Sequence, residues 1–187
     1  MKRIVIGLFM TGLFILITSF SWEEFPTPVR KIQNAAAKLW KDKSLKLLPL
    51  ARQSCVEDGR FFGLLHGADT LGYVFVGRAN SCRSGGCFAE ESGNKPMPNL
   101  QFEYFDYFII YGSRKQIKRI QIYNYQATHG QEVMSRGWLN QFKGYEGKQT
   151  LEYGKDVEAI SGATVSAMAM IDNLQLITTC LRQTDSQ

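Results

Sequence analysis

The pattern of apolar positions divides the chain into a helical start, a strand-rich middle and a helical end. Apolar residues at helical spacing predict an amphipathic helix over Val29 to Leu48. Runs rich in β-branched and aromatic residues predict strands over Leu71 to Arg78, Phe102 to Tyr111 and Ile117 to Tyr125. After Thr164 the apolar residues return at three- and four-residue steps, which predicts a long helix docked through Ala167, Met170, Ile171, Leu174, Ile177 and Leu181.

These elements predict an α+β fold. We expect a mainly antiparallel sheet with the long C-terminal helix, a short helix before it around Trp138 to Phe142, and the N-terminal helix packed outside. The chain has 187 residues, 44% of them hydrophobic, which is enough for one globular domain with a modest core. We place that domain at residues 61–187, after an N-terminal helical segment at residues 22–60.

The first residues have the composition of an export signal. Lys2 and Arg3 precede a largely apolar stretch, residues 4–20, and Ser19 and Ser21 fit the small-residue positions of a cleavage site. Residues 1–21 are therefore predicted to be a signal peptide or, if uncleaved, an N-terminal anchor. In both cases we expect the domain to lie outside the cytoplasm, in the periplasm or held at the membrane and facing outward.

The net charge does not indicate a nucleic-acid partner. The formal charge is +5, and cleavage of the signal would remove Lys2 and Arg3 but no acid. The basic cluster at residues 114–119 falls on a predicted hairpin and the following strand, so we expect a solvated turn there.

The run from Glu158 through Thr164 is the most specific feature of the chain, because it places a hydroxyl where the last helix begins. Gly162 can adopt positive φ, Ala163 adds little bulk, and Thr164 is a residue type suited to capping a helix. The structural alternative for Thr164 is that it only caps the C-terminal helix. Helix N-termini offer unpaired N–H groups to a phosphate. A phosphate ester on this hydroxyl is the chemistry that the run suggests.

This run resembles the flavinylation motif of the FMN-binding domain family, which includes the FMN-bearing C subunit of the sodium-translocating NADH:quinone reductase and the G subunit of the Rnf complex. The resemblance implies that Thr164 takes FMN through a phosphoester installed by a flavin transferase, with Ser161, Gly162 and Ala163 forming the turn. Glu158 stands where the family normally has Asp, and it keeps the charge.

The resemblance covers roughly residue 61 to the C-terminus. Asp69 to Arg78, Ile117 to Gly130 and Trp138 to Gly144 resemble the blocks that precede the motif in the family. It implies a small exported stand-alone FMN-binding flavoprotein that passes electrons to an extracytoplasmic or membrane redox partner. An electron carrier or subunit is expected rather than a complete enzyme, since no substrate pocket is evident in the sequence.

Four other residues or groups are candidates at this site, each with a structural alternative. Ser166 is a second hydroxyl, or a hydrogen-bonding cap. Glu158 assists the transferase, or is a first-turn acid that favours the helix dipole. His129, in the loop from Tyr125 to Gly130, lies near the flavin or in solvent. Two aromatic residues, Tyr123 and Trp138, are flavin walls or core.

The four cysteines are Cys55, Cys82, Cys87 and Cys180, and an even number in an oxidising compartment favours disulfides. The glycine-softened spacing makes a Cys82–Cys87 bridge the preferred pairing; reduced thiols or pairing with Cys55 or Cys180 are the alternatives. Two rival functions follow, namely a non-covalent FMN module and an exported thiol-disulfide protein using Cys82 and Cys87. No zinc-ligand spacing is present, so no metal is expected.

Overall fold

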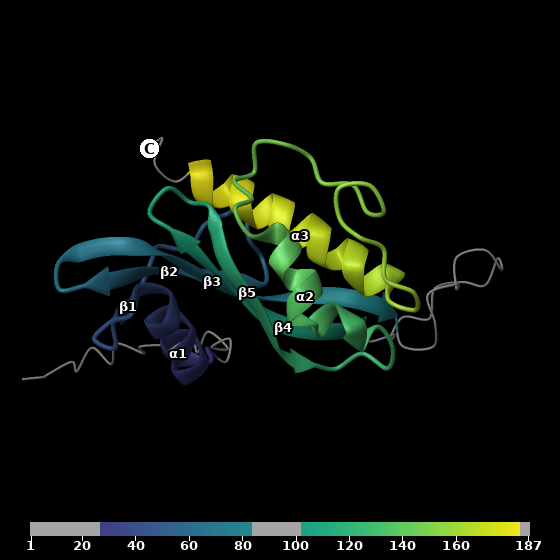
Figure 1. Cartoon of the computed structure of the whole chain (residues 1–187), viewed down its shortest axis with the longest axis horizontal. Coiled ribbons are helices and arrows are strands. Elements are labelled where there is room, and N and C mark those ends of the chain that lie inside the picture. The colour runs from purple at the N-terminus through teal and green to yellow at the C-terminus, as the bar shows by residue number, and fades with distance from the viewer. Residues whose placement is uncertain (1–26, 84–101, 184–187) are drawn as a thin grey trace, which may run out of the picture.

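A five-stranded antiparallel sheet forms the centre of the protein (Figure 1). The structure, a computed structural model, describes residues 27–83 and 102–183. Each strand pairs with the next along the chain, so the order in the sheet is the order in the sequence. The strands are β1 (Lys46–Pro49), β2 (Gly59–His66), β3 (Asp69–Arg83), β4 (Phe102–Gly112) and β5 (Ile117–Tyr125).

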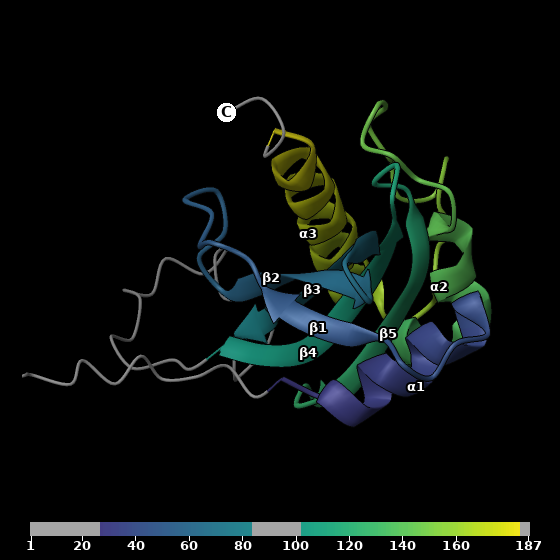
Figure 2. The same ribbon diagram turned by 90° about the vertical axis from the view of Figure 1, so that its left-hand side faces the viewer.

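Helices cover both faces of this sheet (Figure 2). The long helix α3 (Thr164–Gln183) packs on one face, and α1 (Val29–Trp40) packs on the other. Between β5 and α3 the chain forms the short helices η1 (Gln131–Met134), α2 (Arg136–Leu139) and η2 (Asn140–Phe142), which lie beside β5. The α+β fold predicted from the sequence is confirmed, with the sheet fully antiparallel.

Alternation along the central strands creates two cores. Phe75, Tyr107 and Ile109 point toward α3, whereas Val76 and Phe108 point toward α1. Successive side chains of a strand face opposite sides of a sheet, so strands covered on both faces must be apolar at nearly every position. The sequence of β4, where every residue from Phe105 to Tyr111 is buried, satisfies this condition.

The predicted N-terminal helix is too long. It ends at Trp40, Lys41 adopts a left-handed conformation with φ of 56°, and Lys46–Pro49 pairs with β2 as a strand. Pairing with β2 outweighs the helical spacing of Leu45 to Leu48, since local propensity yields to tertiary contacts. The strand β2 itself was not predicted, because its continuous apolar run has no alternation.

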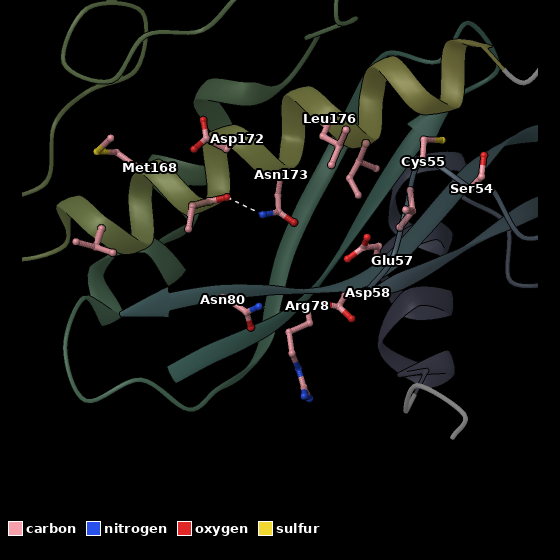
Figure 3. A pocket seen from close by; sticks show the side chains of 14 residues that line it. Ser54, Cys55, Glu57, Asp58, Arg78, Asn80, Met168, Asp172, Asn173 and Leu176 are labelled. Atoms are coloured by element: carbon pink, nitrogen blue, oxygen red, sulfur yellow. Dashed lines mark hydrogen bonds between the residues drawn. The ribbon is translucent and has the colours of Figure 1, made fainter. Parts of the chain in front are cut away.

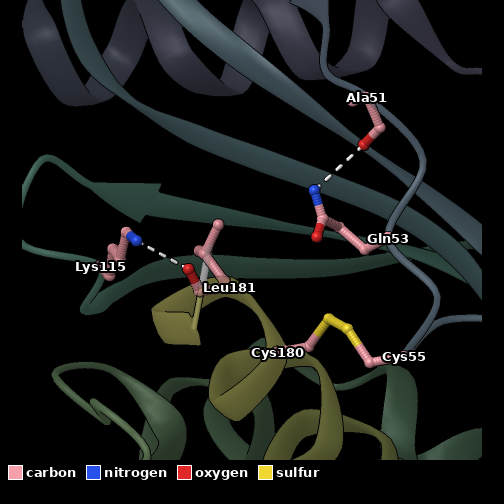
Figure 4. Close-up of a disulfide and its surroundings, with 6 residues drawn as sticks. All are labelled: Ala51, Gln53, Cys55, Lys115, Cys180 and Leu181. Atoms are coloured by element: carbon pink, nitrogen blue, oxygen red, sulfur yellow. Dashed lines mark hydrogen bonds between the residues drawn. A yellow bond between two sulfur atoms is a disulfide. The ribbon is translucent and has the colours of Figure 1, made fainter. Parts of the chain in front are cut away.

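One disulfide ties the β1–β2 connection to the end of α3 (Figure 4). Cys55 and Cys180 are bonded, with Cα atoms 6.1 Å apart, so a pairing of either with Cys82 or Cys87 is wrong. The preferred Cys82–Cys87 bridge stays a prediction, because Cys87 lies outside the described residues. Near the bridge, the Lys115 ammonium donates a 2.7 Å hydrogen bond to the Leu181 carbonyl in the last turn of α3, where a positive charge is favourable.

Lys115 therefore departs from the prediction of a solvated turn, because its side chain is buried and only Ser113 and Arg114 are exposed there. Residues 1–21, predicted to be a signal or anchor, lie outside the described residues. Within the ranges that the structure describes, no helix has both the length and the apolar character to cross a bilayer.

Candidate functional site

Thr164 is the first residue of α3, directly after the turn Ser161-Gly162-Ala163. Gly162 has φ of 78°, and no atom lies within 4 Å of where a Cβ would be, so the turn needs glycine for its backbone and not for space. Ala163 is buried, and its carbonyl accepts the N–H of Ala167 at 2.9 Å, which makes it the cap residue. The alternative in which Thr164 caps α3 is therefore wrong, because Thr164 is already inside the helix. The Thr164 side chain is exposed, and within the described residues its hydroxyl makes no hydrogen bond.

Three side chains fix the backbone that leads into this turn. The Trp138 indole donates to the Glu158 carbonyl at 2.9 Å, and the Gln141 side-chain oxygen accepts the Glu158 N–H at 2.8 Å. The Tyr153 hydroxyl donates to the Ile160 carbonyl at 3.1 Å and accepts the Ile160 N–H at 2.8 Å. The loop is thus held by side chains where it has no secondary structure of its own, and its approach to Thr164 is fixed.

The carboxylate of Glu158 is left in solvent by this arrangement. Only the Glu158 backbone is engaged by Trp138 and Gln141, and the side chain is exposed. The alternative of a first-turn acid is wrong, because α3 starts six residues later and has no acidic residue in its first turn. An exposed carboxylate on a fixed backbone is accessible to another protein.

Ser166 is buried, and its hydroxyl lies 2.9 Å from the Ser81 hydroxyl and 3.0 Å from the Tyr125 hydroxyl. Tyr125 donates its single hydrogen to the His129 carbonyl at 2.5 Å, so Ser166 is the donor in the Tyr125 contact. Burial raises the pKa of Tyr125, which keeps it a neutral donor. Ser166 therefore joins α3 to β3 and to the end of β5.

Gly130 allows the loop after β5 to lie close to the Ser166 and Tyr125 hydroxyls. Its φ is 87°, and a Cβ there would lie 2.8 Å from the Ser166 hydroxyl oxygen and 3.0 Å from the Tyr125 hydroxyl oxygen. Only a residue without a Cβ allows the loop to approach α3 this closely. The sequence analysis identified Ser166 without its partners Ser81 and Tyr125, because long-range hydrogen bonds leave no pattern in sequence spacing.

The other sequence candidates lie in different parts of the fold. The His129 ring is exposed, and only its backbone carbonyl takes part in the contact with α3. Tyr123 belongs to the core that faces α1, where it stacks on Phe108 with ring centroids 6.3 Å apart. Trp138 is buried and supports the Glu158 backbone. These aromatic side chains therefore serve packing and support.

A cavity of 650 Å³, here called the α3 cavity, begins one residue after Thr164 (Figure 3). Val165, Met168 and Leu176 line it, and they are the exposed large apolar residues of α3, at 39%, 49% and 54% exposure. In the sequence, their positions off the core-facing stripe of α3 indicate that these three residues are exposed. Across the cavity lie residues 54–58 of the β1–β2 connection and two polar residues of β3, Arg78 and Asn80.

Arg78 forms an ion pair with a buried acid, Asp106. Asp106 is 1% exposed and accepts two hydrogen bonds from the Arg78 guanidinium, at 2.7 and 3.2 Å. It accepts a third from the Asn124 amide at 2.7 Å. The hydrogen bond to Asp106 raises the pKa of Arg78, and the guanidinium lies 3.5 Å from the centroid of the Tyr104 ring. This network holds the guanidinium on the α1 side of the sheet, pointing away from α3 (Figure 3), and compensates a carboxylate that would be costly to bury alone.

The described residues hold no group of three or more His, Cys, Asp or Glu side chains able to bind a metal ion.

Comparison with known families identifies the region that contains this turn. Residues 106–177 match the family model of the FMN-binding domain. The match runs from Asp106 in β4 to Ile177 in α3 and so includes β5, α2, the fixed loop and Thr164. It confirms the resemblance found in the sequence and indicates FMN as the cofactor. No curated protein matches the chain by sequence.

Proposed function

Because the chain carries an FMN-binding domain at residues 106–177, we propose that it is an exported electron-transfer flavoprotein with FMN attached through a phosphoester to Thr164. One observation supports this most strongly. The Thr164 hydroxyl is exposed and has no hydrogen-bond partner among the described residues, at the end of a loop that three side chains hold in place. A fixed and accessible hydroxyl is what a modifying enzyme needs.

The neighbouring hydroxyls are poorer acceptors. Ser166 is buried and bonded to Ser81 and Tyr125, so its oxygen cannot reach a phosphate without opening that contact. Ser161 is exposed but precedes Gly162, outside the first turn of α3. A phosphate on Thr164 lies at the helix N-terminus, where free N–H groups and the helix dipole stabilise negative charge.

The residues around Thr164 fit the size and chemistry of FMN. The α3 cavity lies within the range of about 300–1,000 Å³ usual for small-molecule sites. Val165 and Met168 present apolar surface next to the attachment point, and Glu57 and Asn173 supply polar groups between α3 and the sheet (Figure 3). When bound, FMN supplies the one- and two-electron chemistry. The chain supplies the attachment atom and an apolar wall.

Covalent attachment agrees with the export predicted from residues 1–21. Outside the cytoplasm a dissociable cofactor is lost by mass action when its free concentration is low, whereas an ester is retained. We propose a flavin transferase as the maturation partner, with the exposed Glu158 carboxylate part of its recognition surface. An extracytoplasmic or membrane redox protein is the proposed electron partner.

The attachment is tested by co-expression with a flavin transferase and ultraviolet imaging of denaturing gels. We expect a fluorescent band from the parent chain and from Ser166→Ala, and none from Thr164→Val, which removes the hydroxyl at nearly constant volume. Persistence of the band in Thr164→Val contradicts the proposal.

The substitution of Glu158 for the family's Asp favours a second candidate, in which the domain binds FMN without an ester. The same gel separates the two. A dark band from the parent chain, with yellow flavin released into the supernatant on boiling, supports reversible binding in place of attachment.

A further inference from the structure

A second pocket, here called the basic pocket, lies along β5 between α1 and α2, with a volume of 430 Å³. Four cations line it, Lys118 and Arg119 from β5, Arg136 from α2, and Lys143 just after η2. No acidic residue lines it. The pocket is separate from the α3 cavity, with which it shares no residue.

The charge of the basic pocket is not neutralised by the protein. In the described parts of the chain none of the four cations pairs with a carboxylate, and Arg119 donates only to the neutral Gln121 side chain at 3.3 Å. Burial and, after it, the charge of Arg136 lower the pKa of Arg119. Like charges gathered without a counter-charge favour an anionic ligand.

The positive surface continues onto α1. Leu39 lines the basic pocket from that helix, and the exposed Lys38, Lys41 and Lys43 are its neighbours in the chain. The only acid among residues 27–50 is Asp42, which bonds to Ser44 and His66, and those bonds lower its pKa.

Exposed apolar side chains are mixed with these cations. Val29 and Leu39 of α1 and Met134 at the basic pocket are 43%, 38% and 40% exposed. Apolar groups among lysine and arginine are typical of surfaces that lie at the boundary of headgroups and acyl chains.

We propose that α1 and the basic pocket together dock on anionic lipid headgroups. The sequence places the apolar residues 4–20 shortly before α1, which begins at Val29, so attachment through that segment holds α1 next to a bilayer. Each lysine or arginine near an anionic surface adds to the attraction, and salt weakens it. Since α3 packs on the opposite face of the sheet from α1, docking leaves α3 and Thr164 turned away from the lipid (Figure 2).

The orientation is measured by lysine acetylation and peptide mass spectrometry on the full chain in lipid nanodiscs. One set contains phosphatidylcholine alone, and the other an equal mixture with phosphatidylglycerol. We expect the acetylation rates of Lys38, Lys118 and Lys143 to fall by about threefold or more in the anionic discs and to recover at high salt. Lys155, 70% exposed in the loop before α3, is the internal control and should react equally in both.

A triple variant, Lys118→Gln, Arg136→Gln and Lys143→Gln, should reduce the protection of Lys38, whereas a control double variant, Lys148→Gln and Lys155→Gln, should not. The Cys55–Cys180 bond and the far-ultraviolet spectrum verify folding of each variant. Equal acetylation of Lys38, Lys118 and Lys143 in both lipids overturns the proposal. Protection that requires an added acidic protein, and not the anionic lipid, overturns it as well.

Discussion

Gly130 is the residue at which the loop after β5 and helix α3 constrain each other most tightly. It combines positive φ with a clash between any Cβ and the hydroxyls of Ser166 and Tyr125. Gly154 has a similar φ of 80°, but a Cβ there would meet nothing within 4 Å. Comparison of the two glycines therefore separates the cost of positive φ from the cost of the steric clash.

Gly130→Ala is expected to destabilise the fold more than Gly154→Ala. Left-handed backbone costs a non-glycine residue about 1–2 kcal/mol at either position. The close contact with Ser166 adds about 1 kcal/mol or more at Gly130, because overpacking a tight contact displaces its neighbours. Urea unfolding of both variants measures the difference, and equal losses would show that the contact relaxes freely.

Individual residues of the site were predictable to different degrees. The position of Thr164 at the start of α3 follows from local chemistry, since a small residue and a glycine before a helical pattern define a helix start. The burial of Ser166 cannot be predicted from local chemistry, because its partners Ser81 and Tyr125 are 85 and 41 residues away in the chain. Its neighbour Val165 is apolar but exposed, and only its position off the core-facing stripe of α3 indicates this in the sequence.

At the scale of elements, the segment between β5 and α3 determines the position of Thr164. It has little regular structure, yet side chains such as Trp138, Gln141 and Tyr153 replace backbone pairing at Glu158 and Ile160. The sequence predicts the short helix around Trp138 and the start of α3. It does not predict these anchors, because a side chain that bonds to a distant backbone group follows no period.

Tyr153→Phe tests the anchoring. Loss of the hydroxyl leaves the Ile160 N–H unpaired, at a cost of about 1–3 kcal/mol if it stays buried. The Ile160 carbonyl keeps one hydrogen bond, from the Ala163 N–H at 3.3 Å. We expect faster hydrogen exchange at residues 159–162 and slower flavinylation. Tyr145→Phe is the matched control, because its hydroxyl donates to the Gln149 carbonyl at 2.9 Å, elsewhere in the same segment. The same response in both variants would contradict a specific role for Tyr153.

For the molecule as a whole, α3 is bound at both ends to distant parts of the chain. Ser166 joins its start to β3 and β5, and the Cys55–Cys180 disulfide and Lys115 hold its end. The sequence predicts the packing of α3 on the sheet through the apolar stripe of that helix. It leaves the disulfide pairing open, since four cysteines permit three arrangements.

Removal of the disulfide is expected to lower the free energy of unfolding by about 2–5 kcal/mol, because Cys55 and Cys180 lie 125 residues apart and the bond restricts the unfolded chain. The double variant Cys55→Ser and Cys180→Ser, compared with the parent chain in guanidinium unfolding, measures this. An unchanged midpoint would mean that the bond is absent from the folded protein.

Stability should decline in alkali. Burial raises the pKa of Tyr107 and Tyr111 above the ordinary value of 10.0, so both stay neutral in the fold and ionise in the unfolded chain. The contribution of these two tyrosines to the free energy of unfolding is complete below about pH 10. Above that pH it is lost, at about 1.4 kcal/mol per pH unit for each tyrosine. Urea unfolding from about pH 9 to about pH 11 measures how steeply the free energy of unfolding falls with pH. In Tyr107→Phe this slope should be smaller by the amount that corresponds to about one proton released on unfolding. A slope unchanged in that variant would contradict the assignment.

The central claim is the ester on Thr164, and the mass of one peptide tests it most directly. After reduction and trypsin digestion, residues 156–182 form a single peptide that contains Ser161, Thr164 and Ser166. In the chain matured with a flavin transferase, we predict that this peptide carries the mass of FMN less one water, and that fragmentation places it on Thr164. An unmodified peptide, or FMN on another of its residues, would contradict the account.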